Sequence, residues 1–531
     1  MKFIFFLFLS IFLLYNNPMK TNVSLLLILI CSLFCFSCLH DSESRSTLEN
    51  YIFAKTVSEY LNDGSNVPVY NREIHTELNN TSAKQYLILM YLAGDSNSIQ
   101  DALLDNMVDV SKGMARSSAD ITTVALFDGI YITTPNGKYT TTPAGAGASL
   151  FNIKGNSKCT SESLVKDFKI TENLPDWISS GEVNSGSYIT LGNFLSWAEQ
   201  NFNPDREKET IIIIGSHGLG TYGTTKPLLS SQAAASIDLD SINVNSFCPD
   251  LTSGTSYIHT NEIPLALESG GFSSTNKAGM LIYDTCLCGT IEEAYEVRDY
   301  AKSIIFSPNE SPAKGFPYET VIAKITPSAP LFSIGENMVN SFAKDYQRKN
   351  FDSVPVTITF ADLTFLDGID SEISELANFF TANTEYKVIL DGTKFSYLKH
   401  VRAIHVDNLS YKCTCFYSFD LGYLCDKIQS YAEENNCEEL ENICTKIKGH
   451  LEKIVACSWR GSTSNSGTNS ITVPTYTDFN TKTNYYGLSI VGHTADEESR
   501  NYNPYARTNF GMNKDTTWKN LLKLLYPEDF K

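Results

Sequence analysis

The chain is short of basic side chains. Its 531 residues include 41 Lys and Arg against 60 Asp and Glu, a formal net charge of -19 at neutral pH. Such an acidic balance argues against nucleic acid as a partner. It allows a cationic substrate or a divalent metal, although simple surface solubility is the commoner reason for such a charge.

Metal-binding motifs are also scarce. Cys413 and Cys415 have no second Cys or His pair beside them, so a zinc site has little support. No Asp-x-Asp-x-Asp-Gly loop occurs, and Asp238, Asp240 and Asp250 are too widely spaced to identify a calcium site. The sequence therefore leaves the metal ligands unknown.

The N-terminus lacks an apolar run long enough to span a membrane. The apolar core at residues 23–36 is shorter than the roughly 20 residues that a transmembrane helix needs. With Lys20 before it and Cys38 after it, this core is typical of an export signal. An apolar segment at residues 2–15 precedes it, so two signals stand in tandem and Met19 is a candidate for the true start. We predict that residues 1–37 are a signal region.

The end of this signal, Leu33 to Cys38, resembles a bacterial lipobox. We therefore expect lipidation at Cys38 and an outer-membrane or cell-surface lipoprotein. The alternative is an ordinary cleaved signal, which would leave the protein periplasmic or secreted. Either way, the sequence predicts export.

Two aliphatic runs end in reactive side chains. Residues 211–214 are four isoleucines followed closely by His217, and residues 280–283 lead to Cys286. Such runs are typical of strands buried on both faces of a parallel sheet, and ligands bind at the carboxyl ends of such strands. The histidine and the cysteine are therefore expected to meet, as a thiol nucleophile and its base.

The surrounding pattern predicts an α/β fold. Strands over residues 86–93 and 121–127 alternate with helices, which favours a mostly parallel sheet flanked by helices. Residues 130–187 look loop-like, and residues 222–260 look like a long loop near the reactive edge. The chain beyond residue 330 is richer in helices, including one expected over residues 438–457.

Six segments of the chain resemble segments of the clostripain family of cysteine peptidases and occur in the same order. Members of that family share a caspase-like fold. The resemblance runs from about residue 86 to the C-terminus, and the segments are residues 91–95, 194–198, 215–220, 307–318, 420–422 and 487–490.

Composition and the resemblance together predict four parts. Residues 1–37 are the signal region, residues 38–84 a polar tether, residues 85–330 a caspase-like catalytic domain, and residues 331–531 complete the peptidase fold as a helix-rich C-terminal lobe.

The resemblance also implies a Cys-His dyad. Cys286 would be the nucleophile, and His217 the general base and acid. Gly218 has no Cβ, so its N–H could join that of Cys286 in an oxyanion hole. A buried histidine beside an inert core cysteine is the alternative for the pair, and a tight turn is the alternative for Gly218.

Asp284 lies two residues before Cys286, on the same side of the strand. The resemblance to the clostripain family implies that this aspartate lines the pocket for the substrate residue before the cleaved bond. A carboxylate in that pocket would select Arg or Lys. The alternative is a structural carboxylate bonded to the following loop. Cys288 departs from the family pattern and is either packing or an oxidation-sensitive thiol.

The resemblance leaves two further expectations open. Some relatives are processed between the His and Cys strands, which would place self-cleavage at Lys226 or Lys277. Calcium dependence is known for some relatives, so calcium is a candidate cofactor, although the chemistry requires none.

The sequence thus predicts an exported cysteine endopeptidase that cleaves protein or peptide substrates after Arg or Lys. We expect a monomer that does not bind nucleic acid and that reaches the membrane through its N-terminal lipid. The alternatives are a non-catalytic lipoprotein that binds peptides or glycans on the same fold, and a transpeptidase or ligase.

Overall fold

The computed structural model describes residues 72–80, 85–95, 99–129, 147–218, 247–250, 253, 256–308, 311–312, 314–346, 356–389, 416–460, 486–494, 505 and 511–530. All of them belong to one unit, Val67–Lys531. The predicted signal region, the lipidation site at Cys38, Cys413 and Cys415 lie outside the described residues.

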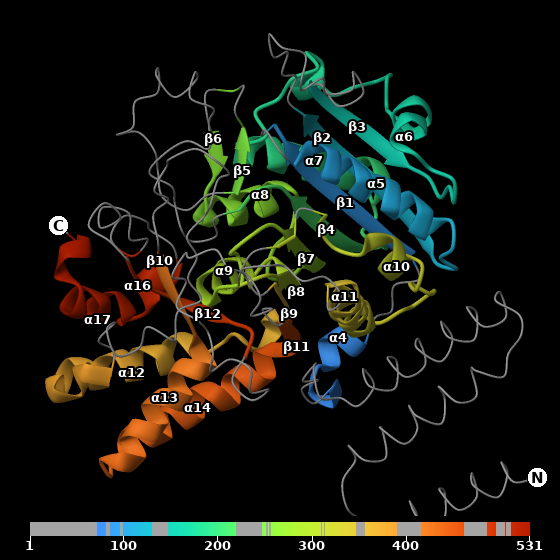
Figure 1. The fold of residues 1–531 in the computed structure, drawn as a ribbon. Coiled ribbons are helices and arrows are strands. Elements are labelled where there is room, and N and C mark those ends of the chain that lie inside the picture. Colours follow the sequence, from blue (N-terminus) through green and yellow to red (C-terminus); the bar gives the residue numbers. More distant parts are fainter. Residues whose placement is uncertain are drawn as a thin grey trace, which may run out of the picture. The chain divides into compact units, whose positions relative to one another are not determined.

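An eight-stranded sheet carries the fold, in the order β11-β9-β8-β7-β4-β1-β2-β3 (Figure 1). The inner strands β8, β7, β4, β1 and β2 run parallel, whereas β3, β9 and β11 pair antiparallel at the two sides. The predicted mostly parallel α/β sheet is confirmed. The strands are β1 (Gln85–Gly94), β2 (Asp120–Gly129), β3 (Gly147–Ile153), β4 (Glu209–Gly215), β7 (Ala278–Asp284), β8 (Ala301–Phe306), β9 (Thr357–Asp362) and β11 (Val455–Arg460).

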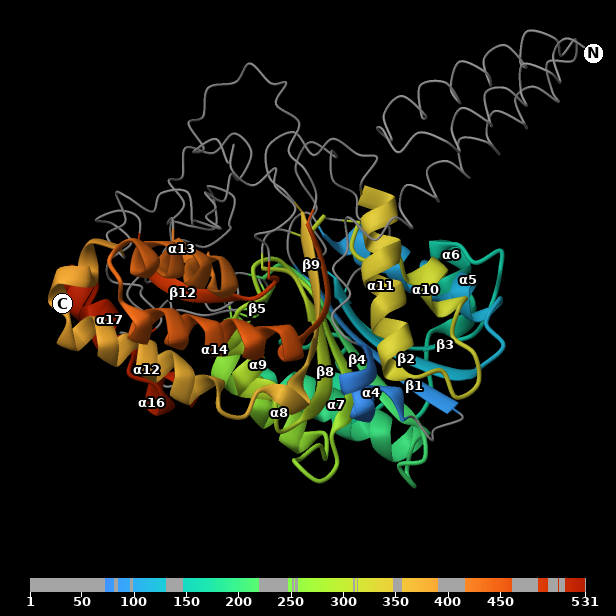
Figure 2. The same cartoon turned by 90° about the horizontal axis from the view of Figure 1, so that it is seen from below.

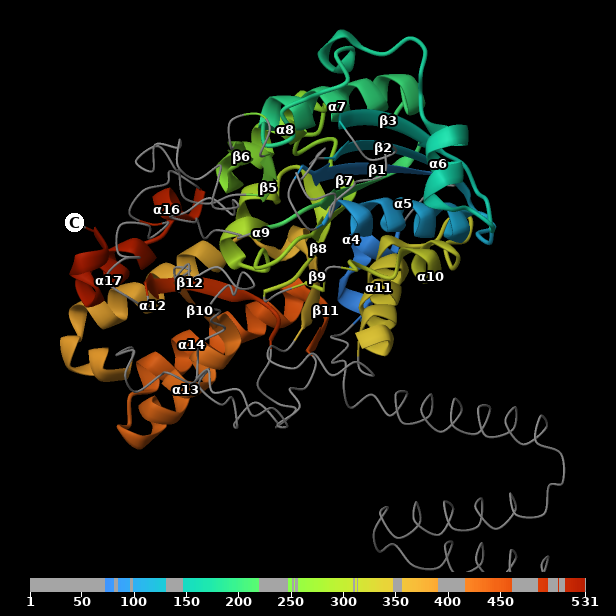
Figure 3. The ribbon, with the colours of Figure 1, turned by 45° about the horizontal axis from the view of Figure 1, so that its top comes forward.

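Helices cover both faces of this sheet (Figures 2 and 3). Side chains of β1 alternate between the two cores, with Leu87 and Leu89 on one face and Ile88 and Met90 on the other, as the period of a strand requires. Both faces of the strand are therefore buried, which explains its nearly continuous apolar sequence. One face packs on α7 (Tyr188–Phe202), α8 (Ile263–Ser269) and α9 (Ile291–Val297); the other packs on α4 (Thr76–Asn79), α5 (Gln100–Met114), α6 (Ser161–Phe168), α10 (Tyr318–Ile322) and α11 (Leu331–Tyr346).

The part beyond residue 330 is rich in helices, as predicted, but it also contributes β9 and β11 to the main sheet. Its helices are α12 (Ile369–Ala382), α13 (Leu421–Glu434), α14 (Glu438–Ile454), α16 (Gly511–Asp515) and α17 (Trp518–Leu525), and β10 (Phe416–Asp420) pairs with β12 (Ser489–Thr494). In the described part of the chain, no helix is both long and apolar enough to cross a membrane.

Two predictions of local structure were wrong, and a third was right except at its end. The segment expected to be a loop, residues 130–187, contains β3 and α6, and residues 222–260 contain β5 (Phe247–Asp250) and β6 (Ser256–Ile258). The helix expected over residues 438–457 ends at Ile454, where β11 begins and joins β9. In each case tertiary pairing outweighs a weak local pattern.

The structure also packs residues 72–80, which fall in the segment expected to be a tether. His75 and Leu78 are fully buried, and His75 Nδ1 lies 2.8 Å from Asp362 Oδ2 at the end of β9. A buried, paired imidazole anchors this stretch of chain to the sheet.

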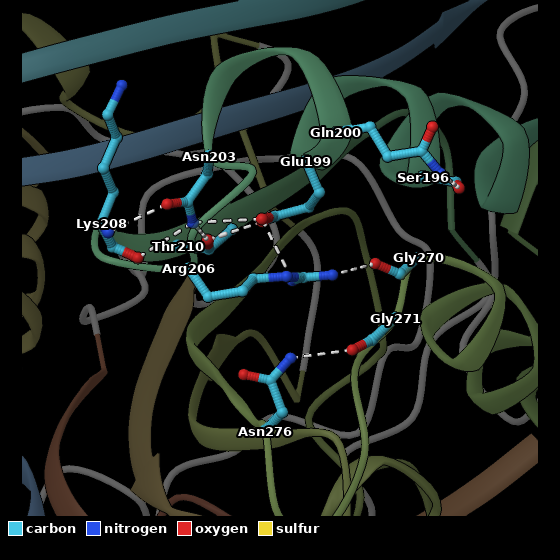
Figure 4. Close-up of polar contacts among 10 residues, drawn as sticks. All are labelled: Ser196, Glu199, Gln200, Asn203, Arg206, Lys208, Thr210, Gly270, Gly271 and Asn276. Atoms are coloured by element: carbon cyan, nitrogen blue, oxygen red, sulfur yellow. Dashed lines mark hydrogen bonds and ion pairs between the residues drawn. The ribbon is translucent and has the colours of Figure 1, made fainter.

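A polar network ties α7 to the start of β4 (Figure 4). The buried Glu199 accepts from Thr210 Oγ1 at 2.7 Å and pairs with Arg206 Nη1 at 3.0 Å. Arg206 also donates to the Gly270 carbonyl at 2.8 Å, at the end of α8. These contacts fix where β4 enters the sheet, and β4 is the strand that leads to His217.

Candidate active site

The strands that lead to His217 and Cys286 are neighbours. β4 and β7 pair in parallel with Gly215 opposite Asp284, and the Ser216 amide donates to the Asp284 carbonyl at 3.3 Å. Because both strands end at this level, the two reactive residues emerge side by side at the carboxyl edge of the sheet.

Gly218 shows how closely the two turns approach. A Cβ at this position would lie 2.7 Å from Thr285 Cβ and 2.8 Å from the Cys286 carbonyl oxygen. Both distances are too short for any side chain, so the segment after β4 lies directly against the backbone of the Cys286 turn. The requirement for glycine here is one of close approach.

His217 sits in a setting that keeps it neutral. Burial lowers the pKa of the imidazole, since the charged form loses its hydration. Its carbonyl accepts from the Cys248 amide at 3.2 Å, which links the segment after β4 to β5. A neutral imidazole is the form that can take a proton from a thiol.

Cys286 is half-buried, and its sulfur faces a loop that sequence reasoning did not single out. The Ser311 amide donates to Cys286 Sγ at 3.3 Å, and Ser311 Oγ donates to the Thr285 carbonyl at 3.2 Å. An N–H aimed at sulfur stabilises negative charge there. Ser311 lies within the family-like segment at residues 307–318, which was the available signal for it.

Two non-glycine residues beside the site have left-handed backbones. Leu287 follows Cys286 with φ 64°, and Cys248, bonded to the His217 carbonyl, has φ 53°. Such conformations cost roughly 1–3 kcal/mol each and persist where the surroundings impose them. Nothing in the sequence marks either residue.

Cys288 supports the same turn. Its thiol is fully buried, lies 2.8 Å from Thr285 Oγ1 and donates to the Cys286 carbonyl at 3.0 Å. These contacts give Cys288 a packing role in holding the turn that presents Cys286.

Asp284 is buried beneath the Cys286 turn, with 6% of its surface exposed. Its Oδ2 accepts from Tyr318 Oη at 2.9 Å, Asn106 Nδ2 at 3.2 Å and the Phe316 amide at 3.4 Å. Burial raises its pKa to about 6, against the opposing effect of the Tyr318 and Phe316 hydrogen bonds. The bonds from Phe316 and Tyr318 match the structural alternative, in which Asp284 is tied to the chain that follows.

Of the two positions expected for self-cleavage, the structure describes one. Lys226 lies outside the described residues. Lys277 directly precedes β7, at the end of the strand opposite Cys286, and its ammonium donates to the Arg298 carbonyl at 2.7 Å. The structure thus separates Lys277 from the reactive thiol by the length of a strand.

A sequence profile of the clostripain family matches residues 90–524 of this chain. Clostripain of Hathewaya histolytica is 21% identical over 479 residues, which cover 82% of this chain and 83% of the relative. Among solved structures, a secreted C11 cysteine protease from Bacteroides thetaiotaomicron in complex with an irreversible peptide inhibitor is 16% identical, with a TM-score of 0.51, covering 82% of this chain and 99% of the other. An inactive zymogen C11 protease from Parabacteroides distasonis is 18% identical, with a TM-score of 0.46, covering 85% and 99%.

Proposed function

Since the chain belongs to the clostripain family and is a cysteine peptidase, we propose that it is an exported endopeptidase that cleaves after Arg or Lys through Cys286 and His217. The packing of Gly218 against the Cys286 carbonyl and Thr285 carries this proposal, because it brings the His217 turn onto the Cys286 turn.

The proposed chemistry is that of a thiol and an imidazole acting together. Neutral His217 takes the proton of Cys286, and the thiolate attacks the scissile carbonyl. The imidazolium then gives that proton to the leaving amine as the peptide bond breaks and a thioester remains. Water, deprotonated by His217, hydrolyses the thioester and returns the thiol. The N–H groups of Gly218 and Cys286 are the donors assigned to the oxyanion.

Asp284 is the proposed basis of specificity. Above about pH 6 its carboxyl is ionised, and it lies in a buried position two residues from the nucleophile. A buried carboxylate attracts a guanidinium or ammonium more strongly than an exposed one, since water screens it less. The three donors on Oδ2 hold the carboxylate in place for that contact.

Fluorogenic peptides that end in Arg, Lys or Asp test the proposal on the purified protein under reducing conditions. We expect turnover of the Arg and Lys peptides and none with Cys286→Ala or His217→Ala. Cys437→Ala is the matched control, because this half-buried cysteine lies at the start of α14. Full activity of Cys286→Ala would overturn the dyad, and equal turnover of the Asp peptide would overturn the role of Asp284.

Export and anchoring rest on the N-terminal sequence. We expect a lipid on Cys38, detectable as incorporation of labelled palmitate that Cys38→Ala abolishes. Recovery of unlabelled protein outside the cell would support the cleaved-signal alternative instead.

A further inference from the structure

The chain that follows Cys286 is held from two sides by other parts of the protein. The Gly289 amide donates to the Ser307 carbonyl at 2.8 Å, directly after β8. The Gly289 carbonyl accepts from the Ser489 amide at 3.0 Å and from Ser489 Oγ at 3.1 Å, at the start of β12. A residue three positions after the reactive thiol therefore joins β8 to a strand of the C-terminal part.

Gly289 also packs tightly against the chain after β8. A Cβ at this position would overlap the nitrogen and the ring of Pro308. Pro308 precedes Ser311 by three residues, and the Ser311 amide is the donor that faces Cys286 Sγ. A movement of Gly289 would therefore disturb both the turn that carries the thiol and the segment that contacts the sulfur.

The helix α9 begins two residues after Gly289 and is bonded to the C-terminal part through Glu292. This side chain is fully buried, and its Oε1 accepts from Tyr505 Oη at 2.7 Å and from the Val491 amide at 2.9 Å. The Val491 carbonyl in turn accepts from Trp518 Nε1 at 2.8 Å, on α17. One carboxylate oxygen thus joins α9 to β12 and to residue 505.

The bonds to Gly289 and to Glu292 come from the same edge of β12. Ser489 and Val491 are two residues apart in this strand, so their amides leave it on the same side. Ser489 also forms a parallel bridge with Thr290, the residue that caps α9. The Glu292 side chain continues this short pairing by one more amide, and so it fixes where β12 lies along the turn.

The tie does not depend on a charge. Burial raises the pKa of Glu292 to about 7, against the lowering effect of the bonds from Tyr505 and Val491. A carboxyl oxygen can accept such bonds in either protonation state. The amide oxygen of a glutamine can accept them as well, whereas an alanine would leave both donors buried without this acceptor.

We propose that Glu292 is a positioning residue of the peptidase. By holding β12 against Gly289, it fixes the turn that presents Cys286 to His217 and to the Ser311 amide. A thiol that moves away from these groups loses the stabilisation of its thiolate, so its pKa rises and it reacts more slowly. The proposal rests on the proposed role of Cys286 as the nucleophile, and it makes the C-terminal part a support of the catalytic turn.

Alkylation of Cys286 by iodoacetamide as a function of pH tests the position of the thiol, with mass spectrometry of the peptide that contains Cys286 as the readout. Glu292→Ala should raise the midpoint of this profile by at least about half a pH unit, since the thiolate is less stabilised. It should lower kcat for the Arg peptide at least about tenfold, as a small displacement of a catalytic group does. KM should change less than about twofold, because no substrate contact is removed.

Glu292→Gln should restore both the midpoint and kcat, because its amide oxygen accepts the same two bonds. A variant that merely destabilised the fold would lower the folded fraction but would not move the midpoint of the folded protein. Failure of the glutamine variant to restore either quantity would overturn the role given to Oε1.

Asp362→Ala is the matched control. Asp362 is a fully buried carboxylate at the end of β9, where it pairs with Ser303 near the start of β8, so it lies at the edge of the sheet opposite Cys286. This variant should lower Tm and leave the alkylation midpoint and kcat unchanged at a temperature where the protein is folded. Equal shifts of the midpoint in Asp362→Ala and Glu292→Ala would show a general loss of stability and overturn the positioning role.

Tyr505→Phe keeps the proposal testable if Glu292→Ala does not fold, because it removes one hydroxyl donor from Oε1 and nothing else. We expect a smaller shift of the midpoint in the same direction. An unchanged midpoint and an unchanged kcat in the folded variants would overturn the proposal. If the unmodified protein turned over no peptide, the proposed function would fail, while the alkylation of Cys286 would still decide whether Glu292 positions the thiol.

Discussion

The ends of β4 and β7 and the ends of β1 and β2 lie along one edge of one sheet, yet their chemistry differs. The first pair of strands presents a thiol and an imidazole, two groups that are neutral when they meet. The second pair presents carboxylates that repel one another, drawn together with Asp250 and Glu182 from outside these strands. A catalytic pair can thus be built by two adjacent strands alone, whereas this charged cluster draws on further segments of the chain.

The largest expected effect separates the two regions completely. Cys286→Ala should lower kcat/KM by at least about 1,000-fold, because the nucleophile is removed. It should leave the stability of the fold unchanged, since no carboxylate of the cluster is touched. Steady-state kinetics and thermal unfolding of the same preparation check both halves; a parallel loss of stability would show that the two regions form a single unit.

Gly218→Ala tests the close approach of the two turns. The added Cβ meets backbone and Cβ atoms at 2.7–2.8 Å, so the His217 and Cys286 turns must move apart. We expect a loss of up to about 100-fold in kcat, as displacement of catalytic groups by about 1 Å can cause.

Gly449→Ala in α14 is the matched control. Its Cβ would meet nothing within 4 Å, and alanine is favoured over glycine in a helix. It should be fully active and slightly more stable. If Gly218→Ala were as active as this control, the proposal that catalysis needs the close approach of the His217 and Cys286 turns would be wrong.

Asp284→Asn should weaken the preference for peptides that end in Arg or Lys over neutral peptides. Removing one charge-assisted contact costs about 1.5 kcal/mol or more, which corresponds to about tenfold in kcat/KM for Arg and Lys peptides. In the unmodified protein that preference should strengthen as the pH rises through about 6, where Asp284 ionises. A pH-independent ratio of Arg to neutral-peptide turnover would assign Asp284 to structure alone.

The smallest effect is a pH dependence of stability. The pKa of Asp128 is raised from 3.8 to about 8 in the folded chain, so folding favours its protonated form. The stability from this group is complete below about pH 4 and is lost as the pH rises through about 8. Asp284 adds a loss of the same sign between pH 3.8 and about 6.

Thermal unfolding between pH 5 and 9 measures this loss, and a fall in Tm of a few degrees is expected. A Tm that rises with pH in this range would have the wrong sign for both carboxyl groups.

The sequence predicted the strands of the sheet more completely than the residues of the candidate active site. Residues 86–93, 121–127 and 211–214 are apolar on both faces, so strand type and position follow from composition. β3 was missed because it directly follows a Gly- and Thr-rich stretch, whereas α6 was missed although Thr160 and Ser163 form a capping box at its start. Ser311 and Cys248 were missed as site residues because each acts through its backbone amide, which leaves no mark in the side-chain pattern.

The sequence alone determined which residues carry the proposed chemistry. His217, Cys286 and Asp284 each follow or end a buried strand, and parallel strands bring such ends to one edge. Only the tertiary structure decided what surrounds them: the amide at Cys286 Sγ, the bonds on Asp284, and the meeting of Asp250 with Asp95 and Asp128. Asp250 and Asp128 are more than a hundred residues apart, and no local pattern encodes a contact made by folding.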